Sequence, residues 1–366
     1  MRIAYILTSL GVGGAERQVL ALAERIKARG HAVSLVVLRG RQPEEWPTTL
    51  DLVHLNMRKS PLSLLAGLRK VRRFLRAFQP DLIHSHTYPA NMAARLLRIS
   101  LPSAAVLSTV HNVYEGAWPR MLAYRLTDFL SCRTTAVSQA AAARYVRLKA
   151  LPARKCQVLG NGIDIAEFTP NSERRAHLRA QTGVQGEFVW LAVGRIVPAK
   201  DFPNLLRAFA QVRAAFPETQ LWIAGEARGT ESAAIQALAA ELGASVRWLG
   251  LRREMPALFD AADGFVLASA WEGMPLAVGE AMAMEKPVVA TDVGGVRELV
   301  GESGVIVPAK SPDLLALSML ALMRRTDEER RKLGSAARTR IAAHFSMDAK
   351  ADEWEALYRK VLAKKI

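Results

Sequence analysis

The sequence has few of the features that mark several classes of protein. It has two cysteines, Cys132 and Cys156, in 366 residues, too few for a disulfide framework, so a reducing cytoplasm is the expected compartment. No uncharged apolar run reaches the roughly 18 residues that a membrane span needs, and the apolar start runs into a glycine-rich turn, which favours a strand over a signal peptide. With no low-complexity segment or short-period repeat, a soluble globular protein of two cores is the expected class.

Acidic residues are scarce in the first half of the chain. Residues 1–165 hold 24 Lys and Arg against 9 Asp and Glu, whereas residues 166–366 hold 26 against 25. The first half therefore carries nearly all of the net charge of +16. A general basic bias would fall on both halves, so the asymmetry favours an anionic partner for the first half.

Short apolar stretches alternate with helical patterns along the whole chain. Strand patterns occupy 2–8, 31–38, 51–55, 81–87, 104–111 and 133–138, and a second series occupies 188–196, 219–227, 245–250, 264–269, 287–291 and 304–308. Such alternation predicts parallel sheets covered on both faces. Two series predict two doubly wound domains, joined near 161–170, where Gly, Asn and Pro cluster.

Ligands bind beyond the carboxyl ends of strands in open parallel sheets, so residues there are the first candidates. In GVGGAER (11–17), Gly13 and Gly14 open a helix and let the backbone approach an anion. The spacing is not the dinucleotide fingerprint, and a tight turn explains the glycines equally well. His111 ends a strand before a glycine-containing loop. His84 and His86 alternate on a strand and could share a side, although no third zinc ligand is recognisable.

In VGRIVPAKD (193–201), Arg195 follows a strand and Lys200 comes five residues later. Asp201 is expected to cap the next helix, with Pro203 in its first turn. The two cations are either solvated loop residues or a phosphate clamp, in which Arg offers a bidentate fork and Lys a mobile point charge.

The segment WEGMPLAVGE (271–280) places two acids at a buried strand–helix junction. Pro275 suits a helix start, so Glu272 is expected in the loop and Glu280 inside the helix. The backbone N–H groups from Gly273 to about Ala277 then form an anion-binding helix tip. Compensation of the helix dipole explains either acid singly, but explains the pair less well.

These motifs together resemble the family 4 retaining glycosyltransferases of GT-B architecture. WEGMPLAVGEAMAMEKPVVATDVGGVREL is similar to the family's C-terminal signature, with its E-x7-E pair, and VGRIVPAKD and GVGGAER match its phosphate-binding and glycine-loop motifs. The resemblance implies an α/β fold of two Rossmann-like domains facing a cleft. It implies an acceptor-binding domain at 1–168, a nucleotide-sugar-binding domain at 169–347, and a helix at 348–366 that returns to the first domain.

The resemblance also implies a role for each motif residue. Glu280 would hold the donor ribose and Glu272 would lie near the donor sugar, while Arg195 and Lys200 would neutralise the leaving diphosphate. His111 would contact the transferred sugar. Further donor contacts would come from Gly13, Gly14, Gly273, Met274, Pro275 and Leu276. Fixed cations and a helix tip stabilise the charge that builds on the leaving group. The chain has no Asp-x-Asp triplet, so we expect neither a metal nor any cofactor, and a UDP-sugar as the favoured co-substrate.

Two segments of the basic half indicate a membrane surface. PLSLLAGLRKVRRFLRAF (61–78) and GAWPRMLAYRLTDFL (116–130) mix apolar residues with arginines, a pattern typical of helices that dock on anionic lipid. For 61–78, a core-facing helix with a solvated basic face is nearly as good an interpretation. We expect a cytoplasmic enzyme, peripheral at the inner face of the cytoplasmic membrane, acting on a lipid-linked acceptor or a polysaccharide or lipopolysaccharide precursor.

Other functions are weighed against this one. The main alternatives are a GDP-mannose-dependent mannosyltransferase and a sugar-nucleotide epimerase of the same architecture, and a regulatory protein on that scaffold is another. A dinucleotide oxidoreductase conflicts with the glycine spacing. A nucleic-acid binder has only the net charge in its favour, so no nucleic-acid partner is expected.

Overall fold

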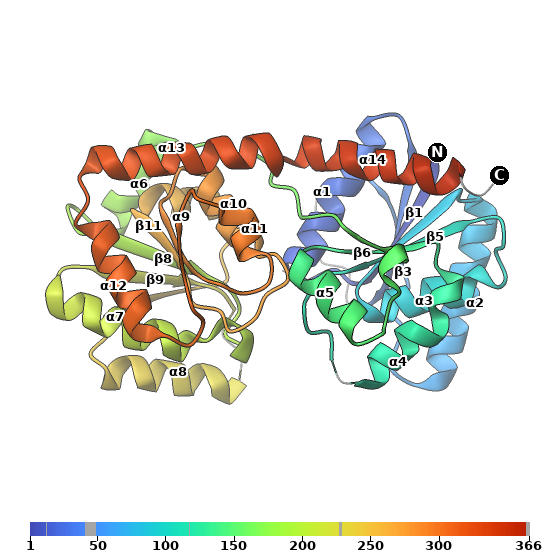
Figure 1. Ribbon diagram of the computed structural model, residues 1–366, viewed down its shortest axis with the longest axis horizontal. Coiled ribbons are helices and arrows are strands. Elements are labelled where there is room, and N and C mark those ends of the chain that lie inside the picture. Colours follow the sequence, from blue (N-terminus) through green and yellow to red (C-terminus); the bar gives the residue numbers. More distant parts are fainter. Residues whose placement is uncertain (12, 41–48, 117, 227–228, 364–366) are drawn as a thin grey trace. The chain divides into compact units, whose positions relative to one another are not determined.

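The computed structural model describes residues 1–11, 13–40, 49–116, 118–226 and 229–363. It divides into two compact units. Unit 1 comprises Met1–Gly162 and Met347–Ile366, and unit 2 comprises Ile163–Ser346. The chain therefore leaves unit 1 inside the 161–170 segment and re-enters it at Met347, the first residue of the last helix (Figure 1).

Unit 1 is built on a parallel sheet. The strands are β1 (Arg2–Ser9), β2 (Ala32–Arg39), β3 (Asp51–His54), β4 (Leu82–His86), β5 (Ala105–Val110), β6 (Arg133–Ala136) and β7 (Cys156–Val158). Their order across the sheet is β3-β2-β1-β4-β5-β6-β7, and every neighbouring pair is parallel. The order reverses between β1 and β4, which is where ligands bind in doubly wound sheets.

Helices cover both faces of this sheet. They are α1 (Gly14–Ala28), α2 (Pro61–Phe78), α3 (Tyr88–Arg98), α4 (Trp118–Thr127), α5 (Gln139–Arg147) and α14 (Met347–Ala363), with 3-10 turns η1 (Asp128–Leu130) and η2 (Ala153–Lys155). Side chains alternate between the faces of a strand. Ile3, Tyr5 and Leu7 of β1 therefore pack with α1 and α14, while Ala4 and Ile6 pack with α2 and α3.

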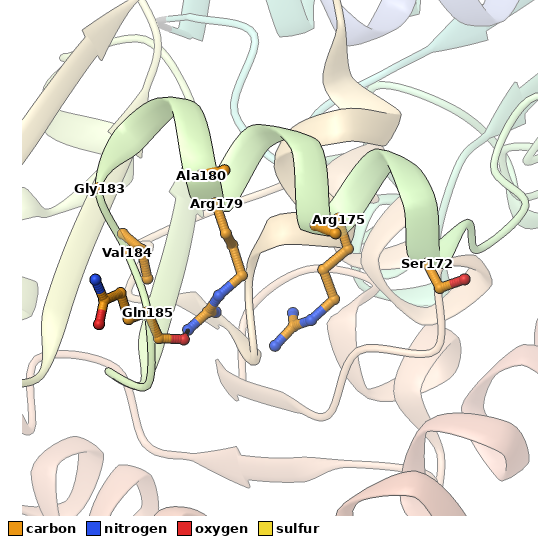
Figure 2. Close-up of a pocket in the computed structure, with 8 residues that line it drawn as sticks. Ser172, Arg175, Arg179, Ala180, Gly183, Val184 and Gln185 are labelled. Atoms are coloured by element: carbon orange, nitrogen blue, oxygen red, sulfur yellow. Dashed lines mark hydrogen bonds between the residues drawn. The ribbon is translucent and has the colours of Figure 1, made fainter.

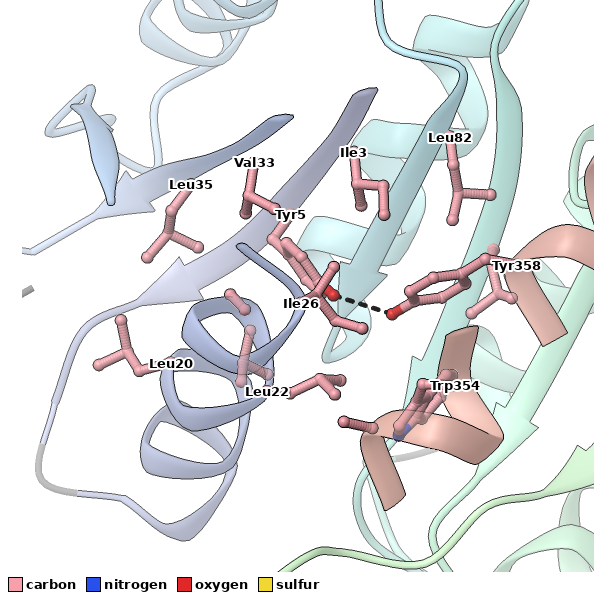
Figure 3. Close-up of a cluster of buried hydrophobic side chains, with 14 of the residues drawn as sticks. Ile3, Tyr5, Leu20, Leu22, Ile26, Val33, Leu35, Leu82, Trp354 and Tyr358 are labelled. Atoms are coloured by element: carbon pink, nitrogen blue, oxygen red, sulfur yellow. Dashed lines mark hydrogen bonds between the residues drawn. The ribbon is translucent and has the colours of Figure 1, made fainter. Parts of the chain in front are cut away.

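The C-terminal helix α14 is an integral part of unit 1. It runs alongside α1 (Figure 1) and buries Trp354, Leu357 and Tyr358 against β1 and α1. The Tyr358 hydroxyl lies 2.9 Å from the Tyr5 hydroxyl, as the dashed line in Figure 3 marks. Because the helix contributes a large share of this core, unit 1 is complete only with the last segment of the chain.

Unit 2 repeats the architecture. Its strands are β8 (Val189–Val193), β9 (Gln220–Ala224), β10 (Val246–Gly250), β11 (Gly264–Leu267), β12 (Val288–Thr291) and β13 (Val305–Val307). They form a parallel sheet in the order β10-β9-β8-β11-β12-β13. The helices are α6 (Ser172–Thr182), α7 (Phe202–Ala215), α8 (Gly229–Glu241), α9 (Met255–Ala261), α10 (Leu276–Ala283), α11 (Val296–Val300), α12 (Pro312–Met323) and α13 (Asp327–His344), with the 3-10 turn η3 (Pro198–Lys200).

The predicted fold class is confirmed, because each unit is a parallel sheet of doubly wound order and the last helix packs on the first unit. The strand β7 is an element that the sequence patterns did not indicate. None of the helices in the described ranges combines the length and the apolar composition that a bilayer crossing requires.

Candidate functional site

The carboxyl end of β8 carries the first group of candidate residues in unit 2. Arg195 is exposed just beyond the strand, and Lys200 closes the turn η3. Asp201 is the N-cap of α7, where its side chain accepts a hydrogen bond from the Asn204 N–H, so the predicted cap is confirmed. A Cβ at residue 194 would lie 2.8 Å from Cε of Lys200, so the lysine side chain passes directly over this glycine at the strand end.

Lys200 and Glu272 form an ion pair across the ends of two neighbouring strands. The Lys200 Nζ donates to Oε1 of Glu272 at 2.6 Å, and the Ser269 hydroxyl donates to the same oxygen at 2.7 Å. The backbone joins the two loops as well, since the Ala270 N–H donates to the Ala199 carbonyl at 2.9 Å. Glu272 is buried, and two donors on one carboxylate oxygen fix the direction of its side chain.

Gly294 and Gly295 pack against the loop that carries Glu272. The Gly295 N–H donates to the Gly273 carbonyl at 2.7 Å. Gly294 has φ +57°, and a Cβ there would lie 2.7 Å from the Gly273 carbonyl oxygen and closer still to that of Glu272. The backbone of residue 294 therefore packs directly on the backbone of the Glu272 loop. A side chain at this position has no space, which explains why it is glycine.

The helix α10 begins directly after this loop. Pro275 is its N-cap, so Leu276 and Ala277 begin the first turn, and Glu280 is buried inside the helix. The expected division, with Glu272 in the loop and Glu280 on the helix, is what the structure has. Gly273, Met274 and Pro275 are buried while Leu276 is partly exposed. The free N–H groups of the first turn give this helix end a partial positive charge.

In unit 1, three histidines lie together at the carboxyl ends of β4 and β5. The His84 and His86 ring centroids are 4.0 Å apart, so the two residues share a side as expected. His84 lies 2.8 Å through Nδ1 from the Tyr358 hydroxyl and 2.7 Å through Nε2 from the Thr109 hydroxyl. His86 Nδ1 lies 3.0 Å from Nε2 of His111.

All three imidazoles are neutral near pH 7. Burial lowers the pKa of His84 and of His86 well below its ordinary value, and the neighbouring histidines lower it further. His111 is partly exposed, but the surrounding side chains keep water from most of its ring, which lowers its pKa to about 4. The histidines therefore act here as hydrogen-bonding groups and not as cations.

Glu115 is a site residue that the sequence patterns did not single out. Its carboxylate accepts the backbone N–H of His111 at 3.1 Å and the hydroxyl of Tyr124 at 3.1 Å. Burial raises its pKa above the ordinary value, against the lowering effect of these hydrogen bonds. Its position four residues after His111 was the one available signal, and an acid in a loop is more often solvated.

Gly13 and Gly14 mark the start of α1. Gly13 is the N-cap of this helix and Gly14 its first residue. The first turn carries an acid, Glu16, whose carboxyl group lies where a Cβ on Gly13 would be. The predicted glycine loop includes position 12, which lies outside the described residues.

Known families match both units. A model described as Glycosyltransferase Family 4 matches residues 12–167, and one described as Glycosyl transferases group 1 matches residues 187–325. A D-inositol 3-phosphate glycosyltransferase of Segniliparus rotundus is 32% identical over 78% of this chain and 67% of its own length. The chain belongs to glycosyltransferase family 4. It is therefore a transferase enzyme, as predicted.

Two further relatives match this glycosyltransferase over its whole length. A GDP-mannose-dependent alpha-mannosyltransferase of Mycolicibacterium smegmatis is 29% identical over 100% of this chain and 99% of its own. The crystal structure of Anabaena HepE in complex with UDP-glucose superposes with a TM-score of 0.85, at 22% identity, over 100% of both chains. At that identity the likeness shows the fold alone, and it confirms the GT-B architecture.

A surface hollow of about 640 Å³ is lined by residues other than the candidate residues of the glycosyltransferase. It is lined by Ser172, Arg175, Ala176, Arg179, Ala180, Gly183, Val184 and Gln185. Figure 2 shows the side chains of Arg175 and Arg179 extending from the same side of α6. Both arginines pair with Asp263 and donate to carbonyls at the C-terminal end of α9. Cations are favourable at a helix C-terminus, so these two residues fasten α6 to α9.

In the described part of the glycosyltransferase, no group of three or more His, Cys, Asp or Glu side chains is arranged to hold a metal ion.

Proposed function

We propose that this glycosyltransferase binds a nucleotide-sugar donor in unit 2, at the carboxyl ends of β8 and β11. The observation that carries the proposal is the Lys200–Glu272 pair, with its 2.6 Å contact and its second donor from Ser269. A cation and an acceptor-only carboxylate then stand side by side. Lys200 meets a diphosphate oxygen, and Glu272 accepts from hydroxyls of the donor sugar.

The helix α10 supplies the remaining donor contacts in this proposal. A diphosphate at the N-terminus of α10 receives the free N–H groups of the first turn and the positive end of the helix dipole. The segment Gly273–Leu276 brings backbone close to sugar and phosphate. Glu280 accepts hydrogen bonds from the ribose hydroxyls. Glu272, the start of α10 and Glu280 thus follow one another along the chain in the same order as sugar, diphosphate and ribose along the donor.

In this proposal the sugar is transferred with retention of its anomeric configuration and without a metal ion. The bond between the anomeric carbon and the diphosphate oxygen breaks, a bond to the acceptor oxygen forms, and the hydroxyl proton leaves with the nucleoside diphosphate. Negative charge builds on the leaving group. Arg195, Lys200 and the helix tip stabilise that charge more in the transition state than in the ground state.

Unit 1 receives the acceptor in this proposal, and its motif residues take the roles that the family resemblance implies. His111 contacts the transferred sugar, and Gly13 and Gly14 approach the diphosphate. UDP-glucose in Anabaena HepE favours a UDP-sugar donor, whereas the mannosyltransferase relative makes GDP-mannose the second candidate.

The nucleotide is tested by thermal-shift measurements with UDP, GDP and ADP, followed by their sugars. We expect UDP to raise Tm most, and a larger effect of GDP would replace the UDP-sugar by GDP-mannose. No stabilisation by any of the three would contradict the donor site itself. Transfer is then followed as release of the nucleoside diphosphate that depends on both donor and acceptor.

Two variants separate binding from transfer. Glu280→Ala weakens nucleotide binding, because the ribose loses its acceptor, by about tenfold for one hydrogen bond to a charged group. Arg195→Ala mainly slows transfer, because its contact strengthens as charge develops. Arg213→Ala is the matched control, since this arginine lies in the last turn of α7 and binds loop carbonyls. Equal, negligible effects at Glu280 and Arg195 would refute the assigned roles.

The acceptor is a lipid-linked sugar or a polysaccharide or lipopolysaccharide precursor at an anionic membrane surface in this proposal. Leu62 on α2, together with Trp118 and Leu126 on α4, is exposed by 81%, 73% and 63%. The basic residues Arg120 and Arg125 of α4 are exposed as well. Exposed apolar side chains among cations suit a headgroup layer.

Flotation with phosphatidylglycerol vesicles tests this surface. Replacing Arg120 and Arg125 by glutamine is expected to weaken binding by about thirtyfold, at about 1 kcal/mol per cation. Leu126→Ser weakens it as well. The control is Leu317→Ser, which removes a leucine exposed by 60% on α12 of unit 2. Binding that is equally strong to phosphatidylcholine vesicles, or unchanged by the arginine substitutions, would contradict an anionic membrane partner.

A further inference from the structure

The ring of His86 is held on three sides. It stacks on Tyr5, with ring centroids 6.0 Å apart at 15°, and lies 4.0 Å from the ring of His84. Its Nδ1 lies 3.0 Å from Nε2 of His111. Its Nε2 is buried and has no hydrogen-bond partner among the described residues. Packing therefore fixes the orientation of the His86 ring. Among the described residues, its one hydrogen-bonding contact is with His111.

His111 is held at two points and open at a third. Its backbone N–H donates to Glu115, and its Nε2 contacts His86. No hydrogen bond within the described residues involves its Nδ1, and the side chain is partly exposed. Nδ1 is therefore the ring atom that a ligand can reach.

One proton lies between the two imidazoles, because nitrogens 3.0 Å apart form a hydrogen bond only when one of them is an N–H and the other a lone pair. Each neutral ring has one N–H in total. If His111 donates through Nε2, then His86 carries its own proton on the buried Nε2, as an N–H without an acceptor. If His86 donates through Nδ1, its Nε2 is left as a lone pair without a donor. Orphaned buried N–H groups are rarer than under-satisfied acceptors, so the second arrangement is favoured.

We propose that His86 is a positioning residue that fixes the tautomer of His111, with the proton on Nδ1 and the lone pair on Nε2. His111 then presents an N–H donor at the carboxyl end of β5. The ligand atom that it receives is an oxygen lone pair, on a sugar hydroxyl or on a phosphate. This inference rests on the proposed function for the identity of the ligand, but the tautomer itself does not depend on it.

The tautomer is measured directly by long-range 1H–15N NMR of the full chain labelled with 15N-histidine. The spectra of His111→Gln and His86→Asn assign the two rings. We expect a protonated Nδ1 and an unprotonated Nε2 for His111. A protonated Nε2 in the native protein would overturn the proposal, whether or not any nucleotide binds.

A matched pair of variants tests the positioning role. In His86→Asn, the amide N–H can replace the Nδ1–H donor, whereas His86→Leu fills the space without one. We expect His86→Leu to lose the tautomer preference and to lower kcat by about tenfold, with the donor KM changed by less than about twofold, as for one lost hydrogen bond. His86→Asn should keep both the tautomer and most of kcat.

The outcomes separate this inference from the proposed function. If His86→Leu retains the native tautomer of His111 and the native kcat, His86 has no positioning role. If the tautomer follows the prediction in both variants but His111→Gln transfers normally, the arrangement of the histidines stands and the sugar contact of His111 fails. Circular dichroism and Tm establish that each variant is folded before its spectrum is compared.

Discussion

Replacing Gly294 with alanine tests whether backbone packing holds Glu272 in place. The new Cβ would lie 2.7 Å from the Gly273 carbonyl oxygen and closer still to that of Glu272. An ordinary contact requires the loop to retreat by roughly 1 Å, and such overpacking costs about 1–3 kcal/mol. The φ of +57° adds about 1–2 kcal/mol for a residue with a Cβ.

Gly183→Ala is the matched control for this substitution. Gly183 ends α6 in the left-handed region, with φ +69° and ψ +22°, and nothing lies within 4 Å of its added Cβ. It therefore carries the backbone strain of about 1–2 kcal/mol without the contact. Both glycines belong to unit 2. The difference between the variants isolates the contact, at about 2–4 °C of Tm for each kcal/mol.

Calorimetry and donor turnover together decide the outcome. We expect Gly294→Ala to unfold at a lower temperature than Gly183→Ala. Only Gly294→Ala should slow transfer, by up to about a hundredfold for a 1 Å displacement of a positioned group. Equal losses of Tm in both variants, with native turnover in both, would refute the idea that this glycine positions Glu272.

Three further substitutions test other contacts. Lys200→Met leaves the buried Glu272 without its cation and should destabilise unit 2 by about 1–3 kcal/mol in urea unfolding, whereas an unchanged midpoint would mean that the pair adds nothing. Tyr358→Phe removes a hydroxyl that pairs with Tyr5, and should cost about 1–3 kcal/mol; a double-mutant cycle with Tyr5→Phe should show coupling, and strict additivity would contradict it. The pKa of Glu355 is lowered from 4.5 to about 2, chiefly by its hydrogen bond with Arg359 and secondly by its hydrogen bond with His31. Its stabilisation is complete above pH 4.5 and is lost as the pH falls towards 2, so Glu355→Gln should differ from the native protein by about 1 kcal/mol at pH 6 and by less at pH 2.

Periodicity predicts most of the fold because the apolar strands are long and evenly spaced. The strand β7 was missed because Cys156–Val158 offers three residues, all of them half-buried, and no apolar run. Its position at the sheet edge follows from pairing with β6, which is a tertiary fact. The start of α7 was predictable from the sequence, because Asp201 and Pro203, which indicate it, lie within one turn of each other.

The sequence predicts candidate residues for the site but not the contacts between them. Lys200 and Glu272 are 72 positions apart, and they meet because β8 and β11 are neighbours in the sheet. The pairing of His86 with Thr109 sets the distance from His86 to His111. Strand order and register are properties of the assembled sheet. They cannot be read from the local residue patterns of a single sequence.

The position of α14 in the chain has a consequence for biosynthesis. Unit 1 begins at the first residue, yet its core includes Trp354 and Tyr358 from the last helix. A ribosome adds about 5–20 residues per second, so roughly 10–40 s separate the completion of Gly162 from the arrival of Met347. During that interval the nascent unit exposes the face of β1 and β4 that α14 later covers. The enzyme thus depends on α14 to end a period in which this apolar face is accessible to chaperones, proteases and other unfolded chains.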